Sequence, residues 1–204
     1  MTRGRFIVFE GGDGAGKTTQ AAKLDAWLEA QNIRHICTRE PGGCALAEQL
    51  RAITLAEDHD PIVELMLMMT ARAAHIAETV RPALERGDWV LCDRFKDSTL
   101  AYQGAGSGQS FERIHQLQEI VSEGIKPDLT ILLDVPYESV QKRKPEASDA
   151  IESRDAVYQQ RVYQGFRDLA AQNPEQYLIL NAERTIDDLH QDIQQNLIER
   201  FGTL

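Results

Sequence analysis

The chain has 204 residues and a formal net charge of −10, which suits one domain of ordinary size with a sizeable core. The negative charge argues against a protein that mainly binds a nucleic-acid backbone, because such proteins need a broad basic face. The start, MTRGRFIV, lacks the apolar segment of a signal peptide, and the densest apolar stretch, 62–69, is too short to span a bilayer. The three cysteines, Cys37, Cys44 and Cys92, have no CxxC spacing, so we expect reduced thiols and a cytoplasmic protein.

Apolar, β-rich runs alternate with sequence of helical period along the whole chain. These runs cover 5–10, 34–38, 88–93, 128–133 and 176–181. The alternation predicts a single α/β domain over 1–204, with a five-stranded parallel sheet and helices on both faces. In such a sheet, functional groups gather where the carboxyl ends of the strands meet the loops.

The first apolar run leads directly into a phosphate-binding loop of pattern GxxxxGK[ST]. Its residues are Gly11, Gly12, Asp13, Gly14, Ala15, Gly16, Lys17 and Thr18. Backbone N–H groups of such a loop surround phosphate oxygens, and the helix expected over 17–31 directs its positive end at the anion. We therefore expect ATP binding, with Lys17 on the β- and γ-phosphates and Thr18 on Mg²⁺. A chance glycine turn before a lysine is the alternative.

Further along the chain, helix boundaries follow from glycine, proline and asparagine. Asn32 is expected to end the first helix, Pro61 to begin the third, and Pro82 to kink or divide the helical region 61–86. The polar, irregular stretch at about 144–153 predicts a short flap (LID) rather than a domain boundary.

Two strand ends carry an aspartate suited to the second side of a Mg²⁺ site. Asp93 follows the third apolar run, and Asp134 follows the fourth. We favour Asp93 because Arg94 comes next and adds a fork-shaped cation beside the phosphates. A structural ion pair is the alternative interpretation of Asp93 and Arg94.

An ordered set of short motifs resembles the bacterial thymidylate kinases, members of the P-loop nucleoside monophosphate kinase family. After the phosphate loop come REPGG at 39–43, TAR at 70–72, DRF at 93–95 and STLAYQG at 98–104. The similarity extends over nearly the whole chain, and the ordered set is more specific than any single motif. The resemblance implies a dTMP kinase that makes dTDP from ATP and dTMP with Mg²⁺, on the route to dTTP.

The resemblance also implies roles for residues that would bind dTMP. Arg39 and Arg94 would bind the acceptor phosphate. Asp13 and Tyr102 would contact the sugar, and the base would be read by Arg72, Thr99 and Gln103. Fixed arginines suit a site where two anions must meet. Tyr102 would exclude a 2′-hydroxyl and Asp13 would accept from the 3′-hydroxyl, although ring packing for Tyr102 and a turn role for Asp13 are alternatives.

Three positions depart from the family pattern. Met68 stands where a phenylalanine usually stacks on thymine, and Cys44 stands where a threonine usually follows REPGG. In the flap, Ala150 occupies the arginine position of a DRxE motif. The cations that remain near the flap are Arg143, Lys144 and Arg154. Lys17 and Arg94 are predicted to be catalytic. For the remaining transition-state charge we predict Arg143, with Arg154 as second choice. The alternative for Arg154 is an exposed ion pair with Glu152 or Asp155.

The remaining chemically active residue types suggest structural roles. The histidines, at 35, 59, 75, 115 and 190, show no ligand spacing with cysteine or carboxylate, so we expect no metal role for them. Met66, Met68 and Met69 lie on a helix that is apolar on more than one face. The resemblance makes one of those faces a homodimer interface; a thick core is the alternative. No nucleic-acid or membrane partner is expected.

Two other functions stay open at this level. A deoxynucleoside kinase would also use the phosphate loop but would accept an uncharged sugar hydroxyl, which would leave Arg39 without a purpose. A nucleotide-binding module without catalysis is the second, and only the altered flap favours it.

Overall fold

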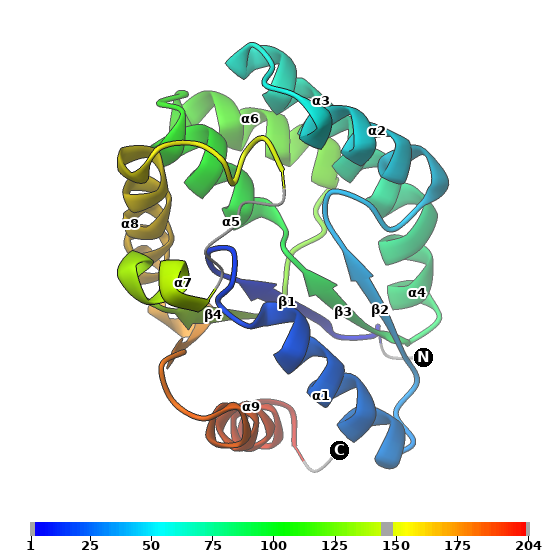
Figure 1. The fold of residues 1–204 in the computed structure, drawn as a ribbon. Coiled ribbons are helices and arrows are strands. Elements are labelled where there is room, and N and C mark those ends of the chain that lie inside the picture. Colours follow the sequence, from blue (N-terminus) through cyan, green and yellow to red (C-terminus); the bar gives the residue numbers. More distant parts are fainter. Residues whose placement is uncertain (1–2, 144–148, 203–204) are drawn as a thin grey trace.

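A computed structural model describes residues 3–143 and 149–202, without the side chains of residues 141 and 143. Its centre is a five-stranded parallel sheet in the order β2-β3-β1-β4-β5 (Figure 1). The strands are β1 (Phe6–Glu10), β2 (His35–Arg39), β3 (Trp89–Asp93), β4 (Leu129–Asp134) and β5 (Tyr177–Asn181). The predicted α/β architecture is therefore confirmed.

Helical segments connect the strands. In chain order they are α1 (Lys17–Ala30), α2 (Ala45–Ala56), α3 (Pro61–His75), the π-helical η1 (Ile76–Val80), α4 (Arg81–Glu85), α5 (Lys96–Thr99), the π-helical η2 (Leu100–Gly106), α6 (Phe111–Ser122), α7 (Tyr137–Arg143), α8 (Ala156–Gln172), the 3₁₀-helical η3 (Pro174–Gln176) and α9 (Ile186–Phe201). In the part of the chain that the structure describes, no helix combines the length and the apolar character needed to cross a bilayer.

Helices cover both faces of the sheet, and the side chains of β1 point alternately to one face and the other. Its odd-numbered residues, Ile7 and Phe9, pack into a core formed with α1 and α9, which lie together below the sheet in Figure 1. Its even-numbered residues, Phe6 and Val8, pack on the other side against η1 and α4. Successive side chains of a strand point to opposite faces, so a strand buried on both sides must be apolar throughout.

The positions predicted to end or divide helices do so. Asn32 follows α1 in the left-handed conformation, with φ of 57°. Pro61 is the first residue of α3, and the Asp60 side chain accepts a hydrogen bond from the Ile62 amide at 2.9 Å. Pro82 is the second residue of α4, directly after the π-helical turn that separates α4 from α3.

The methionines of α3 face different surroundings. Met69 is 1% exposed and belongs to the core with Leu65, whereas Met66 is 46% exposed. The thick-core interpretation of this helix is therefore wrong: within the protomer its outward face leaves Ile62, Val63 and Met66 exposed.

Candidate active site

The phosphate loop joins the carboxyl end of β1 to α1, as the motif predicts. Gly11 has φ of 136°, and a Cβ there would lie 2.7 Å from the carbonyl oxygen of Leu133. Only glycine fits such a close approach at a left-handed φ. Gly16, with φ of 99°, turns the chain into α1, whose first residue is Lys17. The amino end of a helix thus meets the loop, which is the arrangement that binds phosphate.

Lys17 lies across this loop. Its Nζ donates to the carbonyl oxygens of Gly11 at 3.0 Å and Gly12 at 2.8 Å, and the residue is 6% exposed. Burial, and then the nearby Arg94 guanidinium, lower the pKa of Lys17 to about 8. A desolvated ammonium beside a second cation gains strongly from an added anion.

Thr18 and Asp93 meet at the edge of the loop. The Thr18 hydroxyl donates to Asp93 Oδ2 at 2.9 Å, and the buried Oδ1 of Asp93 has no hydrogen-bond partner among the described residues. Asp134 lies apart and approaches Arg167, with 3.8 Å between Asp134 Oδ2 and Arg167 Nε. A hydroxyl beside a carboxylate with an unpartnered oxygen is a donor set that suits Mg²⁺, which favours Asp93 over Asp134.

Arg94 connects the phosphate loop to the pocket beside it. Its backbone is left-handed, with φ of 71°, and its Nη1 donates to Gly11 O at 3.1 Å and Ser98 Oγ at 3.2 Å. Its Nη2 forms an ion pair with Asp13, whose other carboxylate oxygen accepts from the Tyr102 hydroxyl at 2.6 Å. Burial lowers the pKa of Arg94, but the Asp13 carboxylate outweighs burial and raises this pKa above its ordinary value. The guanidinium therefore stays charged and fixed.

A cavity of about 300 Å³ opens next to the phosphate loop. Apolar residues line one part of it: Leu55, Met68, Phe95 and Ile151. Polar residues line the rest, among them Asp13, Arg51, Arg72, Arg94, Thr99, Tyr102 and Gln103. An apolar slot with a few fixed polar groups at its edges is typical of a site for a small planar ligand.

Arg72 is a buried cation in the lining of this cavity. It is 3% exposed and donates to Glu40 Oε2 at 2.7 Å, and its Nη2 donates to Thr99 Oγ1 at 3.0 Å. Burial favours the neutral form of Glu40, but Arg72 and then His75 outweigh it and lower the pKa of Glu40. The Nη1 of Arg72 is buried without a partner in the described part of the chain. The two N–H bonds of this nitrogen are therefore available to a ligand.

Gln103 is held by a second buried carboxylate. Its Nε2 donates to Glu64 Oε1 at 2.8 Å, and both residues are almost fully buried. Glu64 in turn receives Arg154, with 2.5 Å between Glu64 Oε2 and Arg154 Nη2. A carboxylate in an ion pair only accepts hydrogen bonds, so the Gln103 amide directs its NH₂ group at Glu64 and presents its carbonyl oxygen elsewhere.

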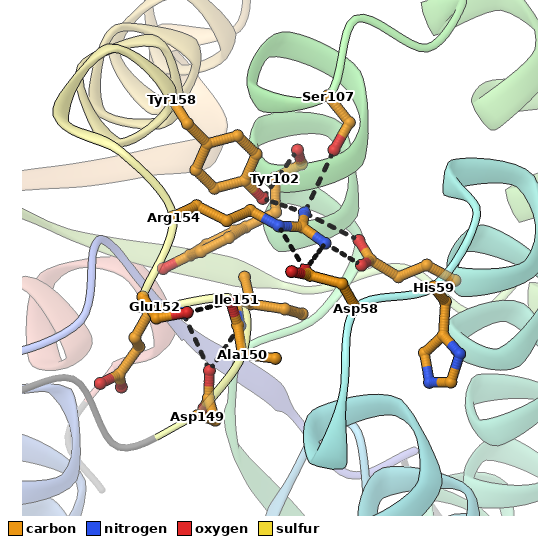
Figure 2. A network of polar contacts seen from close by, with 12 residues as sticks. Asp58, His59, Tyr102, Ser107, Asp149, Ala150, Ile151, Glu152, Arg154 and Tyr158 are labelled. Atoms are coloured by element: carbon orange, nitrogen blue, oxygen red, sulfur yellow. Dashed lines mark hydrogen bonds and ion pairs between the residues drawn. The ribbon is translucent and has the colours of Figure 1, made fainter.

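Figure 2 shows Arg154 at the centre of a polar network that joins several elements. Besides Glu64, it contacts Asp58 Oδ1 at 3.2 Å, the Ser107 hydroxyl at 3.4 Å and the Tyr158 hydroxyl at 3.2 Å. The expected partners, Glu152 and Asp155, are thus wrong: the side chain turns inward to α3 instead of remaining exposed, because buried Glu64 offers a less hydrated carboxylate.

The described end of the predicted flap contributes Asp149, Ile151 and Glu152 to the lining of the cavity. Asp149 Oδ1 accepts from the amides of Ile151 at 3.0 Å and Glu152 at 2.9 Å, which forms a tight turn (Figure 2). Ile151 is 5% exposed and packs in the same cluster as Leu55 and Met68. Ala150 provides no cation there. Arg143 is the last residue of α7, but its side chain and Lys144 lie outside the described residues.

The two arginines predicted to bind the acceptor phosphate differ in position. Arg94 lines the cavity, whereas the described lining does not include Arg39, which is 55% exposed at its side chain and pairs with Glu48 at 2.9 Å. Arg51 takes a place that the motifs did not indicate. It lines the cavity and donates to Pro41 O at 2.9 Å, and burial and then Arg39 lower its pKa.

Tyr102 and Met68, which are predicted to contact the sugar and the base, both line the cavity. The Tyr102 ring packs edge-on against Phe166 at 6.0 Å between centroids and under the Arg94 guanidinium at 5.1 Å. Met68 lines the apolar slot with Phe95. Cys44, the other departure, directly precedes α2, and its side chain makes no cap hydrogen bond.

A phosphate loop, a strand-end aspartate and an arginine that joins them to a second pocket define a P-loop phosphotransferase-like α/β protein. The model of the thymidylate kinase family matches residues 9–193. A thymidylate kinase of Chromohalobacter salexigens is 42% identical, with 100% of this chain and 99% of that protein covered, and one of Deinococcus radiodurans is 44% identical, with 98% and 99% covered. The crystal structure of thymidylate kinase from Ehrlichia chaffeensis superposes with a TM-score of 0.78 at 32% identity and covers 96% of this chain and 99% of that one. The chain belongs to the thymidylate kinase family.

Proposed function

We propose that this protein transfers the γ-phosphoryl group of ATP to the phosphate of dTMP, giving dTDP and ADP. The observation that carries the proposal is the pairing of two sites: the phosphate loop meets, through Arg94 and Asp13, a cavity whose lining combines arginines with hydrogen-bonding side chains and an apolar part. A nucleoside monophosphate has matching parts, with an anion, a sugar and a planar base.

Arg51 and Arg94 suit the acceptor phosphate. Both line the cavity, and the pKa of Arg51 is lowered by burial and by a neighbouring arginine, which indicates excess positive charge that an anion relieves. Arg39 then has a lesser role, because Glu48 already neutralises it at the exposed side of the loop.

Thymine fits the hydrogen-bonding groups of Arg72 and Gln103 in the cavity lining. Arg72 Nη1 is a fixed donor, and Gln103 directs its carbonyl oxygen away from Glu64. Thymine presents carbonyl acceptors and one N3–H donor on its pairing edge, whereas cytosine presents an acceptor at N3. A donor from Arg72 and an acceptor from Gln103 therefore favour thymine, while Met68 contributes a polarisable contact to the ring.

The sugar would lie against Tyr102 and Asp13. The Tyr102 ring is fixed by Phe166 and Arg94, so it resists displacement by an added 2′-hydroxyl. Asp13 accepts from both Arg94 and Tyr102, which holds its carboxylate in the lining of the cavity, where a 3′-hydroxyl would find an acceptor.

The reaction needs alignment and charge stabilisation more than proton transfer, because the acceptor phosphate oxygen is already a nucleophile. Lys17 and Arg94 offer cations where negative charge develops between the two phosphates. Thr18 and Asp93 would hold Mg²⁺, which neutralises charge on the ATP phosphates when bound.

Two arginines remain candidates for charge from the flap. Arg143 stays our proposal for the transition state. Arg154 is better suited to positioning, because its ion pair with buried Glu64 fixes the orientation of Gln103 in the cavity lining. This network lies between α3, the end of η2 and α8 (Figure 2).

The outward face of α3 suits a homodimer interface. Ile62, Val63 and Met66 are each more than two-fifths exposed, and with Leu67 and Thr70 they line a shallow groove of about 250 Å³. Contiguous exposed apolar surface of this kind favours association. A Met66→Glu variant should sediment as a monomer if this face forms the interface, and a variant that sediments like the parent would refute the assignment.

Coupled ADP release over a panel of acceptors tests the proposed activity. We expect turnover with dTMP and ATP and none with thymidine, because Arg51 and Arg94 need an acceptor phosphate. Faster turnover with thymidine would instead identify a deoxynucleoside kinase, and absence of turnover with every acceptor would favour a binding module.

A further inference from the structure

Three side chains capable of binding a metal meet on the surface of the domain, apart from the phosphate loop. Asp25 of α1 lies beside His35 and Cys37 of β2, and the ligand atoms of all three lie within 4.8 Å of one another. The sequence gives no sign of this cluster, because the three residues have no recognised ligand spacing. The expectation that no histidine has a metal role rests on spacing in the sequence, which does not register that His35 meets Asp25 and Cys37 in space.

The fold explains why the three residues converge. β2 is an edge strand of the sheet, and His35 and Cys37 are two residues apart, so they project from the same face. That face meets α1, where Asp25 is 52% exposed at its side chain while the His35 side chain is 6% exposed. The histidine is thus held firmly, and the aspartate and Cys37 remain accessible from solvent.

Hydrogen bonding within the cluster gathers its three ligand atoms around one point. His35 Nδ1 lies 2.7 Å from the carbonyl oxygen of Ile33, and its Nε2 lies 2.9 Å from Asp25 Oδ1. Both neighbours are acceptors, so a neutral ring, which carries one N–H, satisfies only one of them. The Cys37 thiol donates to the same Asp25 oxygen at 3.1 Å. His35 Nε2 and Cys37 Sγ therefore converge on a single carboxylate oxygen.

We propose that Asp25, His35 and Cys37 form a Zn²⁺ site that ties the edge strand β2 to α1. Zn²⁺ takes a histidine nitrogen, a cysteine thiolate and a carboxylate oxygen, at about 2.0–2.3 Å in tetrahedral geometry. Tetrahedral angles at those bond lengths separate neighbouring ligand atoms by about 3.3–3.6 Å, so the 2.9 Å and 3.1 Å contacts need to open only slightly. Solvent at the exposed side supplies the fourth ligand.

The bond from His35 Nδ1 to Ile33 O completes the site. It keeps the proton on Nδ1 and directs the Nε2 lone pair at the metal, which is the usual outer hydrogen bond of a metal-binding histidine. The Zn²⁺ ion replaces the Cys37 thiol proton, which is released to solvent, while the neutral His35 ring keeps its single proton on Nδ1. The mixed nitrogen, sulfur and oxygen set also separates this site from the all-oxygen pair Thr18 and Asp93, which suits Mg²⁺.

Co²⁺ is the probe of choice, because a cobalt–thiolate bond gives a charge-transfer absorption that oxygen ligands do not. The full chain is titrated with Co²⁺ in excess Mg²⁺, and Zn²⁺ is then added. We expect a thiolate absorption that saturates at one Co²⁺ per chain and disappears on addition of Zn²⁺. Titration of Zn²⁺ into weakly buffered protein should release about one proton per ion, that of the Cys37 thiol.

Cys37→Ser should abolish the absorption, and His35→Gln should weaken Co²⁺ binding about tenfold or more. Cys44→Ser is the matched control: Cys44 is also accessible, yet it lies outside the cluster, so its variant should match the parent. Circular dichroism confirms that each variant is folded. Absence of the absorption in the parent, or its persistence in folded Cys37→Ser, would overturn the proposal.

Discussion

Replacing Arg51 by alanine offers a sharp test of how the acceptor phosphate is bound. Arg51 lines the cavity and is anchored to Pro41 O at 2.9 Å, and burial and then the neighbouring Arg39 cation lower its pKa. Hydrogen bonds to charged groups contribute about 1.5–3 kcal/mol. If Arg51 donates to the phosphate of dTMP, Arg51→Ala should therefore weaken dTMP binding by about 10- to 150-fold.

Arg39→Ala is the matched control, because both residues are arginines close to the same loop. Arg39 is 55% exposed and already paired with Glu48. An exposed pair of this kind contributes about 0–1 kcal/mol, so the loss of dTMP affinity should stay below about fivefold.

Isothermal titration of dTMP, in parallel with titration of a non-hydrolysable ATP analogue, measures both variants. ATP-analogue binding should change little in either one, since the phosphate loop is intact. A larger loss of dTMP affinity in Arg39→Ala than in Arg51→Ala would refute the reasoning and return the acceptor phosphate to the REPGG arginine.

Three further predictions concern the base, the sugar and pH. Arg154→Ala should raise the KM for dTMP and lower the preference for dTMP over dCMP while kcat stays close to the parent value; a kcat loss near 10³-fold would instead make Arg154 a source of transition-state charge. Tyr102→Phe keeps the ring and should preserve discrimination against the ribonucleotide, whereas Tyr102→Ala should reduce it about tenfold or more; equal discrimination in both variants would contradict a steric role. Burial, and then Asp97, raise the pKa of Glu10 from 4.5 to about 7. Between these two pKa values the folded state keeps a proton on Glu10 that the unfolded state loses. The contribution of this proton to the free energy of unfolding, on the order of 3 kcal/mol, therefore declines as pH rises. In urea unfolding, the parent should therefore lose more stability than Glu10→Gln between about pH 5 and about pH 7.5. Equal losses would show that the Glu10 carboxyl group is not the source of this pH dependence.

The sequence predicts the elements whose chemistry is local. The five strands, the phosphate loop and the helix ends at Asn32, Pro61 and Pro82 all follow from short-range patterns, and the structure has them. The pairing of Thr18 with Asp93 is also predictable, because adjacent parallel strands bring their carboxyl ends to one edge.

Contacts between side chains that are far apart in the chain could not be predicted from the sequence. Arg51 lies in α2, a helix without a recognisable motif, and only packing against the loop after β2 brings it to the cavity. Arg154 looked exposed, yet it reaches Glu64, which is 90 positions away in the chain. The spacing of apolar residues in a helix indicates which face is buried, but it does not indicate which charged side chain lies next to that face.

Following the γ-phosphate label from ATP tests the central claim most directly. With dTMP and Mg²⁺ present, the label should appear in the β-phosphate of dTDP, in a one-to-one ratio with ADP. Label released as inorganic phosphate, or transferred to the hydroxyl of thymidine while dTMP stays unreacted, would contradict direct transfer between two bound nucleotides.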